Sequence, residues 1–111
     1  MQVFSLPHQV EVVQLSGHLN AAHADAFRDQ LIAAVSSGES TALLLDMSQV
    51  ESMDSAGLMV LVSALSLAQS LNRPLNLCSV SAPVRIILEL TQLDRLFPIF
   101  KDRAACETAQ V

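Results

Sequence analysis

The sequence predicts a single α/β domain with a mixed, mostly parallel β-sheet and helices stacked against it. Short apolar runs rich in β-branched residues alternate with longer segments of helical periodicity, and this alternation is typical of βαβ units. The 111 residues fit one domain, 1–111, and a hydrophobic content of 51% supports a buried core. The predicted order is β-β-α-β-α-β-α-(β)-α, in which the strand in parentheses is optional.

Residues 1–5 and 10–17 are predicted to be two strands that form an antiparallel edge, with Pro7 in the tight connection between them. The segment that follows has apolar residues at helical spacing. Asn20 is a suitable N-cap for this first helix, and Gly38 is a suitable stop.

Residues 41–47, "TALLLDM", form a continuous apolar run, as expected for a strand covered on both faces. Residues 48–54 are predicted to be a loop, and the second helix is predicted to begin around Ser55. Pro74 ends that helix, and residues 75–80 form the next strand.

The third helix is predicted to begin with Ser81 as its cap and Pro83 at an early helical position. Residues 95–100 are a short strand candidate, and residues 102–110 form a weak last helix.

Composition excludes several classes of function. The net charge is −5 and only six residues are Lys or Arg, without a basic cluster, which argues against nucleic acid and against an anionic membrane surface as partners. The start lacks the features of a signal peptide, and the longest apolar stretch is too short to span a bilayer. We therefore expect a cytoplasmic protein.

Metal and thiol chemistry lack their sequence patterns. Cys78 and Cys106 form no CxxC pair, and Cys78 lies in an apolar strand, where a buried inert thiol is expected. His18 and His23 are five residues apart without the one-face spacing of a helical ligand pair. We predict no catalytic residue, no cofactor and no metal.

The stretch "VESMDSAGLMVL" places Asp54, Ser55, Ala56 and Gly57 at the predicted helix start. The commonest use of a serine there is as an N-cap. A catalytic nucleophile is disfavoured, because the stretch is not G-x-S-x-G and no base motif accompanies it. The third interpretation is that Ser55 is phosphorylated, because a helix N-terminus accommodates an anion.

A helical wheel divides the second helix into two faces. The core face has Leu58, Leu61, Leu65 and Ala68, flanked by Val62 and Ala64. The opposite face consists of small uncharged residues and one Met, namely Ser55, Met59, Ser63, Ser66 and Ser70. Such a face suits protein docking, and the alternative is that another element of the fold covers it.

Three stretches together resemble a STAS domain, most closely a stand-alone anti-sigma factor antagonist: "LSGHLN", "ALLLDMSQVESMDSAGLMVLVSA" and "LNLCSVSAPVRIILELTQLDRLFPIF". The resemblance implies a switch rather than an enzyme. In such switches an anti-sigma factor serine kinase phosphorylates the antagonist, which then no longer holds the kinase. A metal-dependent serine phosphatase restores binding, and we expect a monomer or a weak dimer.

The resemblance also assigns residues. Ser55 matches the phosphoacceptor, Asp54 would orient the site or complement the kinase, and Gly57 would keep the helix start open to another protein's active site. The partner-binding surface is expected to include Met59, Ser63, Ser66, Ala56, Asp46 and Ser48.

The chain departs from the family pattern at four positions. His18 and Asn20 stand where acidic residues are frequent, Ala56 replaces a second hydroxyl, and Gln92 stands where many members carry Gly. Two other functions remain open at this point. One is a constitutive STAS scaffold or transporter-associated subunit without a phosphoswitch, and the other is a small hydrolase that uses Ser55.

Overall fold

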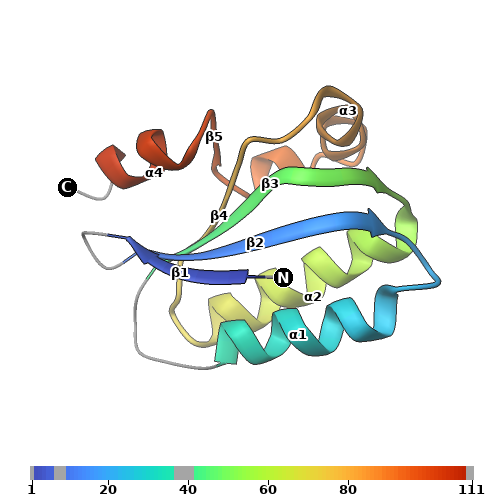
Figure 1. Cartoon of the computed structure of the whole chain (residues 1–111), viewed down its shortest axis with the longest axis horizontal. Coiled ribbons are helices and arrows are strands. Elements are labelled where there is room, and N and C mark those ends of the chain that lie inside the picture. Colours follow the sequence, from blue (N-terminus) through green and yellow to red (C-terminus); the bar gives the residue numbers. More distant parts are fainter. Residues whose placement is uncertain (1, 7–9, 37–41, 110–111) are drawn as a thin grey trace.

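The computed structural model describes residues 2–6, 10–36 and 42–109. Their strands form one sheet in the order β1-β2-β3-β4-β5 (Figure 1), in which β1 is antiparallel to β2 and all later neighbours are parallel. The predicted mixed, mostly parallel sheet with an antiparallel edge is therefore confirmed.

The elements follow one another in the predicted order. The strands are β1 (Gln2–Leu6), β2 (Val10–Leu19), β3 (Ala42–Met53), β4 (Leu75–Cys78) and β5 (Ile99–Phe100). The helices are α1 (Ala24–Ser36), α2 (Ser55–Ser70), α3 (Ala82–Leu90) and α4 (Arg103–Ala109), with a 3₁₀ helix at Leu93–Arg95.

The two faces of the sheet have different covers. Helices α1 and α2 lie side by side along one face (Figure 1), and α3 adds Val84 and Leu88 to the same large apolar core. On the other face, Cys106 of α4 packs in a smaller cluster with Cys78 and Leu44. Burial raises the pKa of the Cys78 thiol to about 11 and also raises the pKa of Cys106, as expected for inert core thiols.

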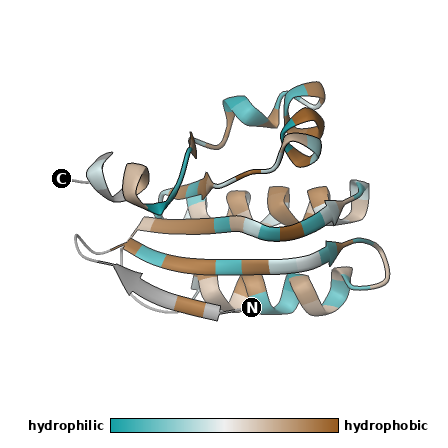
Figure 2. Cartoon of the chain, turned by 45° about the horizontal axis from the view of Figure 1, so that its top comes forward, coloured by the Kyte–Doolittle hydropathy of each residue, from teal (hydrophilic) through white to brown (hydrophobic). Residues whose placement is uncertain are grey.

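Strand β3 is longer than predicted, because residues 48–53 belong to it and not to a loop. The pairing of β3 with β2 is irregular at two places: Gln14 pairs with Asp46, but Ser16 pairs with Gln49. Such bulges break the two-residue alternation of burial by which a strand is recognised. Figure 2 shows the result, a hydrophobic strand interrupted by hydrophilic residues toward its carboxyl end.

Helix termini differ from the predictions in detail. Helix α1 begins at Ala24, so Asn20 is not its N-cap. Instead, Asn20 accepts a hydrogen bond from His23 through its backbone oxygen, and its side chain contacts the His23 ring. The predicted stop at Gly38 and the connection at Pro7 lie outside the described residues.

Two details in the carboxyl-terminal third of the chain differ from the predictions. Ser81 is the N-cap residue of α3 with a proline in the first turn, as predicted, although its side chain makes no capping hydrogen bond. The strand candidate 95–100 shrinks to Ile99–Phe100, because Leu93–Arg95 turns as a 3₁₀ helix and Phe97 enters the core.

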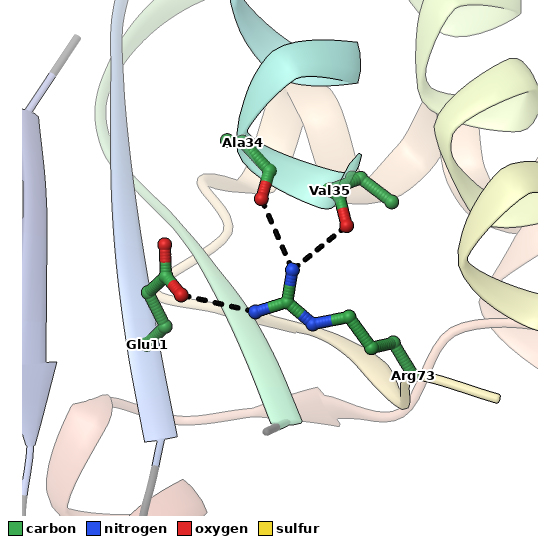
Figure 3. A network of polar contacts seen from close by, with 4 residues as sticks. All are labelled: Glu11, Ala34, Val35 and Arg73. Carbon is green, nitrogen blue, oxygen red and sulfur yellow. Dashed lines mark hydrogen bonds and ion pairs between the residues drawn. The ribbon is translucent and has the colours of Figure 1, made fainter. Parts of the chain in front are cut away.

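A buried arginine connects α1 and β2 to the turn that follows the C-terminal end of α2 (Figure 3). The Arg73 guanidinium donates through Nη1 to the carbonyls of Ala34 and Val35, at 3.1 and 2.7 Å, and through Nη2 to Glu11 at 3.0 Å. Its side chain is only 3% exposed. These carbonyls end α1 and need partners, so Arg73 ties α1 and β2 to the turn after α2.

Candidate functional site

The N-terminus of α2 is capped by Asp54, not by Ser55. One Asp54 carboxylate oxygen accepts hydrogen bonds from the backbone N–H groups of Ala56 and Gly57, at 2.9 and 3.1 Å, and the other accepts from Ala21 at 3.2 Å. The bond from Gly57, with those from Ala21 and Ala56, holds the pKa of Asp54 below its usual value. Ser55 is therefore not the N-cap, although that is the commonest use of a serine at a helix start, because the extended Asp54 occupies that position.

Ser55 is the first residue of α2 and is exposed. Among the described residues, no hydrogen bond joins its hydroxyl to a histidine. The nearby His18 ring is engaged elsewhere: its Nδ1 lies 2.7 Å from Ser52 Oγ and its Nε2 lies 3.2 Å from Glu51. This arrangement lacks the nucleophile–base contact of a serine hydrolase.

Gly57 has an internal packing role. The residue is buried, and a Cβ at this position would meet the carbonyl carbon of Leu19 at 2.9 Å and the carbonyl oxygen closer still. The absent Cβ thus serves internal packing, and the expectation that Gly57 keeps the helix start open to another protein's active site stays a prediction. Its missing side chain allows α2 to approach the end of β2, where Asp54 N–H also donates to Leu19 O at 3.1 Å.

The two faces of α2 lie as the helical wheel predicts. The buried residues are Gly57, Leu58, Val60, Leu61, Ala64, Leu65 and Ala68. Met59 is 60% exposed, and Ser63 and Ser66 are exposed beside it. Ser63 Oγ donates to the Met59 carbonyl at 3.0 Å, so this hydroxyl is already satisfied by its own helix. No other described element covers the face.

Asp46 and Ser48 are both predicted to lie on the partner-binding surface, but only Ser48 is exposed. Asp46 is buried, with one oxygen accepting from Ser48 N–H at 2.9 Å and the other from Arg103 Nε at 2.6 Å. Burial by itself raises the pKa of Asp46, but the hydrogen bonds from Ser48 and Arg103 outweigh it and lower that pKa overall. Asp46 therefore anchors α4 to β3, whereas Ser48 is exposed on the bulged part of β3.

Neither a cluster of metal ligands nor a membrane-spanning helix occurs among residues 2–6, 10–36 and 42–109. No group of three or more His, Cys, Asp or Glu side chains is arranged there to hold a metal ion. None of the helices there is long and apolar enough to cross a bilayer.

The profile of the STAS domain family matches residues 5–106. The chain belongs to the STAS domain family. The anti-sigma F factor antagonist of Paenibacillus polymyxa is 29% identical over 91 residues, which make up 82% of this chain and 78% of that protein.

Solved structures agree with this assignment. An anti-sigma factor antagonist from Mycobacterium paratuberculosis is 28% identical, with a TM-score of 0.83 over 97% of this chain and 90% of that one. The Bacillus anti-sigma factor antagonist SpoIIAA, solved in unphosphorylated and phosphorylated forms, is 17% identical to this STAS chain. Its unphosphorylated form has a TM-score of 0.77 over 98% of this chain and 95% of that one, which shows a shared fold.

Proposed function

We propose that this STAS protein is a phosphorylation-switched anti-sigma factor antagonist. Its unphosphorylated form binds and sequesters an anti-sigma factor that is also a serine kinase. Phosphorylation of Ser55 releases that kinase, and a metal-dependent serine phosphatase resets the switch. The antagonist relatives support the partner class, and the geometry at the start of α2 supports the acceptor residue.

The main support for this proposal is that Asp54 and Ser55 have different roles at the start of α2. Asp54 satisfies the N–H groups of Ala56 and Gly57, whereas the Ser55 hydroxyl is exposed and unused by the fold within the described residues. Modifying Ser55 therefore removes no capping hydrogen bond. A phosphate can be added and removed there while α2 keeps its N-terminal structure.

Electrostatics makes the phosphate effective against a partner. Phosphoserine carries a charge of about −1.5 to −2 near neutral pH. Two unit charges ~4 Å apart repel by about 1 kcal/mol in water and about 4 kcal/mol at an effective dielectric near 20. The adjacent Asp54 carboxylate already accepts hydrogen bonds from two N–H groups of the helix start. These groups therefore do not neutralise the phosphate, and its charge can repel a partner. About 1.4 kcal/mol corresponds to tenfold in affinity.

The face of α2 beyond Ser55 supplies the contact surface. Met59 offers an adaptable apolar side chain one turn from the acceptor, and Ser63 has its hydroxyl satisfied by the helix. Burying this face against a partner thus requires little desolvation of polar groups. Ser66 extends the same uncharged surface.

The test combines site mapping with binding. Protein isolated from its native host is mapped by phosphopeptide mass spectrometry, and Ser55→Ala and Ser55→Asp are compared in pull-downs from host extract. We expect phosphate on Ser55, retention of a kinase by Ser55→Ala, and its loss by Ser55→Asp. Phosphate confined to Ser48, Ser52 or Ser81 would overturn the assignment of Ser55.

A further inference from the structure

A groove lies between the carboxyl-terminal part of β2 and one face of α1. Its volume is about 330 Å³, and its walls come from residues 15–19 of β2, from His23 just before α1, and from Ala26, Phe27 and Gln30 of α1. The last pair that β2 makes with β1 is Gln14 with Gln2. Figure 1 shows β2 continuing beyond β1, above α1. Among the described residues, positions 16–19 therefore have a strand partner only on the β3 side.

The walls of the groove are apolar and carry no fixed charge. Leu15, Leu19 and Phe27 line it, and none of its described lining residues is Asp, Glu, Lys or Arg. An ionic ligand would lose its hydration without gaining a counter-charge. The volume is at the lower end of the range for small-molecule sites. An uncharged compound of one or two rings fits both properties.

The polar groups of the groove have a defined place. His23 and Gln30 stand at its α1 side. On the β2 side, the strand edge beyond Gln14 has backbone donors and acceptors that no described residue of β1 pairs with. Unpaired strand edges bind groups that offer a donor next to an acceptor, as another strand would. A planar ring with an adjacent N–H and C=O has this pattern.

We propose that this groove binds a small, uncharged, planar molecule whose adjacent donor and acceptor pair with the edge of β2 and whose ring packs on Leu15, Leu19 and Phe27.

The same groove is connected to the start of α2. Leu19 O accepts the Asp54 N–H, and the Leu19 backbone is the surface against which Gly57 packs. The neighbouring His18 contacts Ser52 and Glu51 at the end of β3. A ligand that holds residues 18–19 in place therefore also steadies the capping residue beside Ser55. This coupling to phosphorylation rests on the proposed function, whereas the binding site does not.

Oxindole is a suitable probe, because it is a neutral bicyclic lactam with adjacent N–H and C=O groups. Amide chemical shifts of the ¹⁵N-labelled protein are followed during titration. We expect saturable shifts in residues 15–19 and 23–30, and N-methyloxindole, which lacks the donor, should bind about tenfold more weakly. Equal binding of the two compounds would overturn the pairing with the strand edge.

A matched pair of variants locates the site. Ala26→Leu fills the groove, whereas Ala33→Leu adds the same side chain to another exposed position of α1 that does not line the groove. Leucine is a good helix former, so both variants should fold. Oxindole affinity should fall about tenfold or more in Ala26→Leu and stay within about twofold in Ala33→Leu. No saturable shifts in the wild type, or equal losses in both variants, would overturn the proposal.

The coupling has a readout that needs no kinase. Oxindole should slow hydrogen exchange of the Ala56 and Gly57 amides, which Asp54 caps. Unchanged exchange at saturation would show that the groove does not act on the helix start. If Ser55 is never phosphorylated in the host while oxindole still binds and slows exchange, only the proposed function fails.

Discussion

The two ends of α2 are held in opposite ways. At the N-terminal end, Asp54 accepts three backbone N–H bonds at an exposed position. At the C-terminal end, Asn72 adopts a left-handed conformation with φ of 57°. Next to it, the buried Arg73 binds two carbonyls of α1 and the carboxylate of Glu11.

The difference suits the proposed switch, because one end of the helix is free to change its charge while the other end holds the fold. Removing a partner from a buried charge is costly because nothing replaces it, whereas an exposed charge exchanges its partners for water. The buried end thus stabilises the packing of α1 and α2. The exposed end can change its charge state while the core remains intact.

The largest effect is expected from Arg73→Met at the buried end. The variant removes the guanidinium that donates to the carbonyls of Ala34 and Val35 and to the carboxylate of Glu11, so the free energy of unfolding should fall by about 3 kcal/mol. Urea denaturation measures it, with the exposed Arg85→Met as control. Equal stability of the two variants would remove the basis of the comparison.

The second largest loss of stability is expected from Gly57→Ala, which tests whether the exposed end of α2 is also closely packed. The new Cβ must push α2 away from Leu19, so the free energy of unfolding should fall by about 2 kcal/mol. Ser66→Ala, at an exposed position on the same helix, is the control. Wild-type stability of Gly57→Ala would mean that α2 and β2 are less closely packed than described.

Met59→Glu should affect binding without affecting the fold. Met59 is 60% exposed and Glu is a good helix former, so circular dichroism should be unchanged. The added charge must be desolvated at the proposed interface, which should weaken kinase binding at least about tenfold. Ser70→Glu, at the far end of the helix, should have a smaller effect in titration calorimetry. Wild-type affinity of folded Met59→Glu would exclude this face.

The smallest effect concerns acid stability at the exposed cap. The pKa of Asp54 in the folded protein lies below the ordinary 3.8, so its charge adds stability above that pH, and the gain is lost as pH falls through the lowered pKa. Asp54→Asn keeps a good cap but cannot titrate. The variant should match the wild type near neutral pH and lose less stability between about pH 5 and pH 2. Parallel losses in thermal melts would contradict this role.

Local patterns in the sequence were sufficient for much of the site. The alternation of apolar runs and helical segments predicts the mixed sheet, and the wheel of α2 predicts both the buried Leu58, Leu61 and Leu65 and the exposed Met59. These features depend on spacing along one element, which does not require knowledge of the rest of the fold. The assignment of Ser55 as acceptor came from the family resemblance and remains a prediction.

The cap of α2 was within reach of the sequence but was misassigned by one residue. Aspartate is as good an N-cap as serine, so the pair Asp54–Ser55 allows either residue at that position. The choice follows from Leu19 O and Ala21 N–H, which bind the Asp54 backbone and side chain from the β2–α1 connection. A contact across 33 positions of sequence leaves no local signal.

By itself, the sequence determined the order of elements, the uncharged face of α2 and the buried character of Cys78. These properties follow from periodicity and composition within single segments. Only the tertiary structure decided that residues 48–53 extend β3, that Gly57 packs on Leu19, and that Arg73 and Asp46 are internal. Each of these depends on pairs of atoms from separate segments, and their energies are set by burial and distance, which exist only once the chain has folded.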